Sequence, residues 1–143
     1  MLLARVLYVK QGGDKQFVIV DAAMTDLIRP ALYDANHFVW PVRPGMDNMP
    51  AERRHNLRMP GCRMVDVVGP VCESGDFLAR ERFMPPVQRG DLLAVFTAGA
   101  YGFVMASHYN SRPNAAEVLV EGGNFRIIRC RESYDDLIKA EKA

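Results

Sequence analysis

The chain has 143 residues, a length typical of one domain with its own hydrophobic core. Hydrophobic residues make up 49% of it and charged residues 24%, as in an ordinary globular protein. The formal net charge is +1, which gives no electrostatic reason to expect nucleic acid or a membrane surface as a partner. No apolar run reaches the roughly 18 residues that a membrane-spanning helix needs.

The cysteines and the amino-terminal residues indicate a compartment. Cys62, Cys72 and Cys130 are odd in number and widely spaced, which favours a reducing environment over a disulfide framework. Arg5 and Lys10 interrupt the apolar stretch that a signal peptide would need. We therefore expect a cytoplasmic protein. The histidines and cysteines show no metal-ligand spacing, so we also expect no metal site.

The first part of the chain predicts a β-hairpin. Residues 5–10 and 16–22 are rich in β-branched and aromatic side chains, which favour strands. The sequence QGGD at 11–14 separates them, and Gly12 and Gly13 can both take a positive φ. This spacing predicts two antiparallel strands joined by a tight turn.

A short strand, a long loop and another strand are predicted next. Residues 37–42 form a short apolar run in which Pro41 indicates an edge strand or a bulge. Residues 43–61 are polar and carry three prolines, which predicts a surface loop. Within this loop, residues 51–54 (AERR) suggest one helical turn. Residues 63–69 return to a strand pattern.

The last third predicts one more strand and a second hairpin. Residues 91–99 are a largely apolar run after a Gly-Asp turn, and we expect a strand there. Residues 116–130 contain two strand-like runs that turn at Gly122 and Gly123.

The carboxyl-terminal residues 132–143 predict a helix. Ser133 is a suitable cap, acidic residues follow it in the first turn, and Tyr134, Leu137 and Ile138 share one face. Taken together, the elements predict a mainly β fold, an antiparallel Greek-key barrel or sandwich with short helices and a C-terminal helix.

One isolated helical fragment, DLIRPALYDANH, carries a candidate binding pair. Pro30 suits the first position of a helix and keeps Arg29 outside it. Tyr33 follows about one turn later, so Arg29 and Tyr33 can converge on a carboxylate or a phosphate. Alternatively, Arg29 pairs with Asp26 or Asp34 while Tyr33 covers the core.

A lone cysteine stands beside two acids in GPVCESGD, residues 69–76. A nucleophilic cysteine needs a nearby cation or a helix N-terminus, whereas Glu73 and Asp76 disfavour a thiolate. If Cys72 acts chemically, we therefore expect a general acid that gives up a proton. The alternative is a small buried hydrophobic residue at the end of a strand, with Gly75 allowing the turn.

Tyr101 lies in the segment TAGAYGF, directly after a predicted strand. The glycines on either side of it, Gly99 and Gly102, allow a backbone or a ligand to come close. An exposed tyrosine there can donate a hydrogen bond to a ligand. It can equally be a turn residue packed on the surface, and spacing alone does not separate the two.

Three segments together resemble the C-terminal domain of the diaminopimelate decarboxylases: residues 20–37, 67–82 and 90–123. Their order and spacing match over nearly the whole chain, and CESGD with RPALY is the most specific part. Ornithine and arginine decarboxylases share a Gly-Pro-x-Cys turn but typically carry Asp where this chain has Glu73. The resemblance implies a pyridoxal 5'-phosphate-dependent carboxy-lyase with an N-terminal (β/α)₈ barrel and a C-terminal β domain. It also implies a homodimer whose active sites lie at the subunit interface.

The resemblance also implies a role for each candidate residue. Arg29 and Tyr33 match positions that hold a substrate carboxylate, and Tyr101 matches a tyrosine that reaches cofactor and substrate. Cys72 and Glu73 match residues delivered into the partner subunit's site. There Glu73 would recognise the distal ammonium of meso-2,6-diaminopimelate. Cys72 would protonate the α-carbon after carbon dioxide leaves, which gives L-lysine.

The family's Schiff-base lysine, phosphate-binding glycines and barrel have no counterpart in this sequence. None of the four lysines lies in an apolar setting that would suit imine formation. We therefore expect residues 1–143 to be a single C-terminal β domain that contributes half of a site and is inactive alone. Two alternatives stay open: a free-standing, non-catalytic β domain for binding or regulation, and a domain of a related basic amino-acid decarboxylase.

Overall fold

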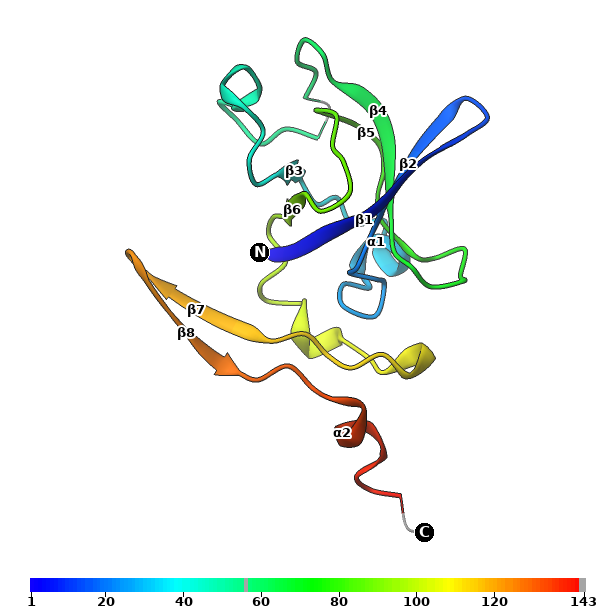
Figure 1. Ribbon diagram of the computed structural model, residues 1–143, viewed down its shortest axis with the longest axis vertical. Helices are drawn as coiled ribbons and strands as arrows, with labels where there is room; N and C mark the ends of the chain where they lie inside the picture. Colours follow the sequence, from blue (N-terminus) through cyan, green and yellow to red (C-terminus); the bar gives the residue numbers. More distant parts are fainter. Residues whose placement is uncertain (56, 142–143) are drawn as a thin grey trace.

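The computed structural model describes residues 1–55 and 57–141. Its main element is a six-stranded sheet, with a separate two-stranded hairpin near the carboxyl end (Figure 1). The six strands are β1 (Leu2–Gly12), β2 (Lys15–Val20), β3 (Val39–Pro41), β4 (Arg63–Val68), β5 (Phe77–Met84) and β6 (Leu92–Val95). The hairpin consists of β7 (Glu117–Glu121) and β8 (Asn124–Arg129). The helices are α1 (Arg29–Tyr33) and α2 (Tyr134–Ile138), with 3₁₀ turns η1 (Met46–Asn48), η2 (Phe103–Met105) and η3 (Tyr109–Ser111).

The six strands lie in the order β3-β6-β1-β2-β4-β5, and all neighbours are antiparallel except β2 and β4. The long strand β1 serves two partners: Leu2–Arg5 pair with β6, and Val6–Gly12 pair with β2 across an irregularity after Val6. Because one bent strand joins both halves, the sheet curls into a barrel-like layer (Figure 1). The predicted mainly β, barrel-like fold is confirmed, with one parallel pair.

The inner face of this sheet forms the hydrophobic core. Every strand of the sheet contributes to it, and the loop after β2 adds Ala22 and Leu27. The buried set is Ala4, Val6, Val18, Val20, Ala22, Leu27, Val39, Trp40, Val65, Val67, Leu78, Ala79, Met84, Leu93 and Val95. The Trp40 indole donates to the Asn48 carbonyl at 3.0 Å, which ties the long loop to the core.

Both predicted hairpins are confirmed. In the first, Gly13 takes a φ of 59°, and in the second, Gly122 takes a φ of 60°. These values suit a tight turn between twisted strands and are costly for residues with a side chain. The predicted edge position of Pro41 is also confirmed, because β3 pairs only with β6 at the margin of the sheet.

Two predictions about helical residues need correction. Residues 51–54 form no helical turn, and the long loop instead has the 3₁₀ turn η1 at Met46–Asn48. Helix α1 begins at Arg29, so Arg29 is helical and Pro30 is the second residue. The first residues of a helix have no intrahelical acceptor for their N–H groups. Proline, which has no N–H group, therefore loses no helical hydrogen bond at the second position.

The predicted C-terminal helix is present but shorter than expected. Ser133 caps α2 through a reciprocal capping box with Asp136, as its sequence position predicts. Of the predicted range, residues 142 and 143 lie outside the described residues. Among the described helices, none is long and apolar enough to cross a membrane.

Strand β5 was not predicted from the sequence, because a bulge breaks its alternation. Glu81 takes a φ of 53° in mid-strand, and its N–H donates to the Asp66 carboxylate at 2.7 Å. The pairing with β4 is irregular across Asp66, between Val65 and Val67, and again between Val67 and Val68. Three successive charged residues at 80–82 therefore replace the alternation of polar and apolar side chains that a regular strand would show.

Candidate active site

The loop between β2 and α1, residues 21–28, contacts the turn that carries Cys72 and Glu73 and the segment that follows Tyr101, and we call it the anchor loop. The Met24 N–H donates to the Asp76 carboxylate at 2.7 Å. The Thr25 carbonyl accepts the Ser107 N–H at 3.0 Å. Helix α1 follows the loop directly in the chain. Two separate stretches of sequence are therefore held against one short loop, and helix α1 continues directly from it.

Arg112 adds a second tie to the anchor loop. Its guanidinium donates to the Asp21 carbonyl at 2.6 Å and lies 3.8 Å from the Asp26 carboxylate. Asp26 also accepts the Ala23 N–H at 2.8 Å, within the loop. Burial raises the pKa of the Asp26 carboxyl, and the hydrogen bond from the Ala23 N–H and then the charge of Arg112 oppose that rise. The segment after Tyr101 is thus fastened to the same loop as helix α1.

Residues 69–76 form a compact turn between β4 and β5, here named the cysteine turn. The Gly69 N–H donates to the Asp76 carbonyl at 3.0 Å, and the Asp76 N–H donates to the Glu73 carbonyl at 3.1 Å. The turn lies beside α1: a side-chain carbon at Gly75 would be 3.6 Å from the methyl group of Ala31 (Figure 1). These contacts place the turn next to the helix that carries Arg29.

Cys72 and Glu73 are both exposed on this turn. The alternative that Cys72 is a small buried hydrophobic residue is therefore wrong. Among the described residues all three cysteines are free thiols. The two acids of the motif differ in their surroundings, because Glu73 faces solvent while Asp76 is buried.

The Glu73 carboxylate is held by a residue that the sequence analysis did not single out. The Tyr109 hydroxyl, in η3, donates to Glu73 Oε1. This hydrogen bond raises the pKa of Tyr109. The backbone beside it is unusual in the structure: Asn110 and Ser111 have φ values of 57° and 52°, in a region that residues with side chains seldom adopt. A backbone of this kind often marks a functional site.

The structure brings Arg29 and Tyr101 together. The guanidinium carbon of Arg29 lies 5.4 Å from the centre of the Tyr101 ring, within the range of a cation–π interaction. Among the described residues, Arg29 makes no ion pair with Asp26 or Asp34, and Asp26 pairs with Arg112 instead. The alternative that Arg29 serves a local ion pair is therefore wrong.

Tyr33 lies at the last position of α1 and is 62% exposed, so it does not cover the core. Within the described part of the chain, neither Tyr33 nor Cys72 makes a hydrogen bond or ring contact with the Arg29–Tyr101 pair. Tyr101 is 57% exposed, so the phenol is open to a ligand. Of the predicted site residues, Arg29 and Tyr101 are therefore the pair that the described structure brings into contact.

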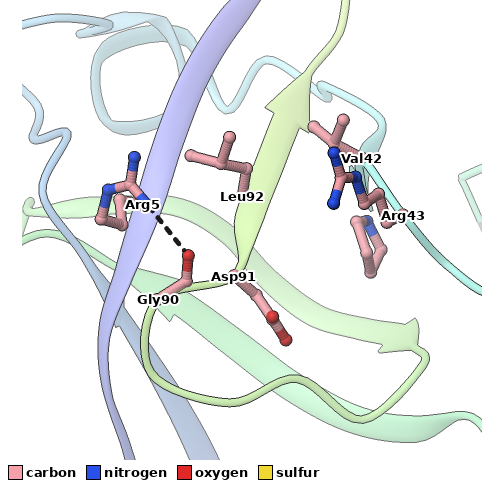
Figure 2. Close-up of a pocket in the computed structure, with 7 residues that line it drawn as sticks. Arg5, Val42, Arg43, Gly90, Asp91 and Leu92 are labelled. Atoms are coloured by element: carbon pink, nitrogen blue, oxygen red, sulfur yellow. Dashed lines mark hydrogen bonds between the residues drawn. The ribbon is translucent and has the colours of Figure 1, made fainter.

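A hollow of about 330 Å³ lies elsewhere, between β1, β3 and β6. Figure 2 shows the Arg5 guanidinium in it, donating to the Gly90 carbonyl at 3.0 Å. The Asp91 carboxylate accepts the Gln88 N–H at 2.9 Å. None of the predicted site residues lines this hollow. Both Arg5 and Asp91 hold the turn before β6, so the hollow adds nothing to the site.

The first two thirds of the chain match a known protein family. Residues 1–99 match the family described as pyridoxal-dependent decarboxylase, C-terminal sheet domain. The chain belongs to this family. The match covers β1 to β6, the six strands of the barrel-like sheet, together with α1 and the cysteine turn.

Relatives of this decarboxylase domain match almost the entire chain. Diaminopimelate decarboxylase of Aquifex aeolicus is 49% identical over 97% of the chain, and that of Archaeoglobus fulgidus is 51% identical over 99%. The solved Helicobacter pylori diaminopimelate decarboxylase, complexed with L-lysine, superposes with a TM-score of 0.81 at 40% identity, covering 97% of this chain and 31% of that one. The chain spans 30% and 31% of the two curated relatives named above.

Proposed function

We propose that this chain is the C-terminal domain of a diaminopimelate decarboxylase, a pyridoxal-phosphate-dependent lyase that converts meso-2,6-diaminopimelate to L-lysine and carbon dioxide. The observation that carries the proposal is identity of about half over nearly the whole chain with proteins of that name. The chemistry of the exposed turn supports it, because a thiol and a carboxylate stand side by side at Cys72 and Glu73. We further propose that the longer protein has an N-terminal (β/α)₈ barrel and acts in the cytoplasm.

Arg29 and Tyr33 are proposed to hold a substrate carboxylate. A guanidinium presents a planar set of N–H donors that matches the two oxygens of a carboxylate. The Tyr101 ring beneath Arg29 limits where that group can point, because a cation over a ring face is held by the ring's negative quadrupole. Arg29 is only partly exposed, which strengthens its attraction for an anion.

Glu73 is proposed to select the distal ammonium group of the substrate. A carboxylate next to a cation makes a strong, charge-assisted hydrogen bond. Tyr109 occupies one oxygen of Glu73 and leaves the other for the ligand. A substrate without a distal ammonium would leave this carboxylate without its charge partner, which is the basis of discrimination.

Cys72 is proposed to donate the proton that completes the reaction. The carboxylate carbon leaves as carbon dioxide, and the electron pair left at the α-carbon takes the proton of the Cys72 S–H group. The cofactor, when bound, supplies an electron-accepting ring that stabilises this charge. We propose that Cys72 and Glu73 serve the site of the second subunit in a homodimer.

The residues of this domain suit one wall of a cofactor site. Tyr101 offers an exposed phenol to cofactor and substrate. Lys15 is paired with Asp66 and Glu81 at 3.5 Å and 3.4 Å, which keeps its amine protonated and unsuited to forming an imine. The lysine that binds the cofactor is therefore proposed to come from the barrel.

The proposed function is tested by assaying two forms of the protein for carbon dioxide release. We expect the full-length protein with pyridoxal phosphate to decarboxylate meso-diaminopimelate and to act poorly on ornithine, arginine and lysine. Residues 1–143 alone should release none, because the cofactor lysine is missing. Release from ornithine or arginine at a comparable rate would favour a related decarboxylase. An inactive full-length protein, or an open reading frame without a barrel, would favour a binding domain.

Replacing Tyr109 with phenylalanine should raise KM for meso-diaminopimelate by about three- to tenfold, the usual effect of losing one hydrogen bond. The reason is that Glu73 loses the donor that orients its carboxylate. Steady-state kinetics on the full-length protein measures this effect, with Tyr134→Phe as the control because Tyr134 is another exposed tyrosine, on α2. An unchanged KM would mean that Tyr109 does not orient Glu73 for substrate.

A further inference from the structure

Asp76 is a buried acid that the proposed reaction does not use. Its side chain is only 4% exposed, and each of its carboxylate oxygens accepts a backbone N–H from a different segment. Oδ1 accepts from Met24 in the anchor loop at 2.7 Å, and Oδ2 accepts from Val71 in the cysteine turn at 2.6 Å. One carboxylate therefore joins the turn that carries Cys72 to the loop that precedes Arg29.

The Asp76 carboxylate occupies the space that a side chain at position 69 would need. A side-chain carbon at Gly69 would lie 2.4 Å from both oxygens of Asp76, closer than any real contact of that kind. The φ of Gly69 lies outside the left-handed region, so the requirement for glycine is spatial. Gly69 and Asp76 thus form a matched pair: the glycine makes room, and the acid fills it and bonds two backbone segments.

We propose that Asp76 is a positioning residue that fixes the cysteine turn against the anchor loop. This inference rests on the proposed function of Cys72 and Glu73. Asp76 touches no substrate, since its oxygens are committed to Met24 and Val71. It acts by fixing where Cys72 and Glu73 stand on this domain, and so how they reach the site that they serve.

A carboxylate suits this task better than its amide counterpart. Both N–H groups need an acceptor, and an ionised carboxylate has two acceptor oxygens and no donor. Asparagine would turn an NH₂ group toward one of the two backbone N–H groups and leave that donor without a partner. A buried donor without a partner is costly, so the turn would shift to recover one.

The test uses two variants that disturb the pair in different ways, and one matched control. Asp76→Asn removes one acceptor, and Gly69→Ala pushes the carboxylate away without changing any polar group. The control is Asp66→Asn. Asp66 is 7% exposed and accepts the Glu81 N–H at 2.7 Å, so it is a similarly buried acid that bonds backbone but does not touch the cysteine turn.

In the full-length protein we expect Asp76→Asn and Gly69→Ala to lower kcat by about 10²-fold, since a displacement of about 1 Å can cost that much. They should also raise KM, because Glu73 moves with Cys72. Asp66→Asn should leave both values within about threefold of wild type. In Asp76→Asn combined with Cys72→Ala, kcat should be no lower than in Cys72→Ala alone, because no thiol remains to be positioned.

Hydrogen exchange gives a measurement that does not depend on activity. The amides of Met24 and Val71 should exchange about tenfold faster in Asp76→Asn, as expected when a hydrogen bond is lost. Amides of β1 and β2 should keep their protection. If the wild-type protein fails to act on meso-diaminopimelate, the proposed function fails, and the exchange data still decide whether Asp76 holds the two segments together.

Three results would overturn the inference. The first is unchanged exchange at Met24 and Val71 in Asp76→Asn. The second is faster exchange there with kcat and KM both within threefold of wild type, which would leave Asp76 with a structural role only. The third is a loss of activity in Asp66→Asn as large as that in Asp76→Asn, which would show that general destabilisation of the protein lowers the activity.

Discussion

Cys72→Ala in the full-length protein is expected to lower kcat by about 10²–10⁴-fold, the usual contribution of a positioned acid or base. KM should change little, because alanine removes the proton donor and leaves Glu73 in place. Cys72 is exposed on its turn, so the substitution creates no cavity and the loss reports on chemistry. Steady-state kinetics measures it, with Cys130→Ala as the control because Cys130 is another exposed free thiol.

Mixing two inactive variants tests the expected role of Cys72 across the subunit interface. One is Cys72→Ala, and the other lacks the barrel lysine that binds the cofactor. After subunit exchange, one site of each hybrid dimer has both an intact lysine and an intact cysteine, so activity should return. If hybrid dimers are shown to form and the mixture stays inactive, Cys72 serves its own subunit.

Arg29→Met is expected to raise KM for meso-diaminopimelate by about 10²-fold, because a charge-assisted, two-point contact with a carboxylate is lost. Methionine keeps an unbranched apolar side chain at that position, so packing beside Tyr101 is largely kept. Arg29→Lys should recover only part of the affinity, since an ammonium offers a point charge in place of a planar fork.

The control for Arg29→Met is Arg58→Met. The Arg58 guanidinium lies 4.4 Å from the centre of the Phe83 ring, so it makes the same kind of ring contact away from the site. We expect KM to stay within about twofold of wild type in Arg58→Met. A similar KM in both variants, or a loss confined to kcat in Arg29→Met, would show that Arg29 does not bind the substrate carboxylate.

The hairpins could be predicted because they depend on local chemistry. Gly13 and Gly122 mark turns that need a positive φ, and Ser133 marks a helix start. Strand β5 could not be predicted this way, because its bulge at Glu81 is set by Asp66 on the neighbouring strand. The contact that breaks its pattern spans 15 residues of sequence, beyond the reach of periodicity.

The sequence allowed the candidate site residues to be proposed, but not the hydrogen bonds that hold them in place. Arg29, Cys72 and Tyr101 could be proposed from their neighbours in the sequence: a tyrosine one turn later, two acids, and flanking glycines. The Tyr109–Glu73 hydrogen bond joins residues 36 positions apart, so only the folded chain brings them together. From the sequence alone, Glu73 and Asp76 are two equivalent acids near the cysteine. In the fold, Glu73 is exposed and Asp76 is buried.

The anchor loop has a consequence for how this domain can change over evolutionary time. Met24 and Thr25 hold their contacts through main-chain groups and Asp26 through its side chain, so a substitution that changes the path of the loop backbone alters several of these contacts at once. Effects of substitutions at Asp76 and Arg112, whose side chains bind the loop, should therefore depend on the loop sequence present and fail to add. Related sequences are expected to vary these positions in concert, and transplanting one segment between relatives should work only when the loop is moved with it.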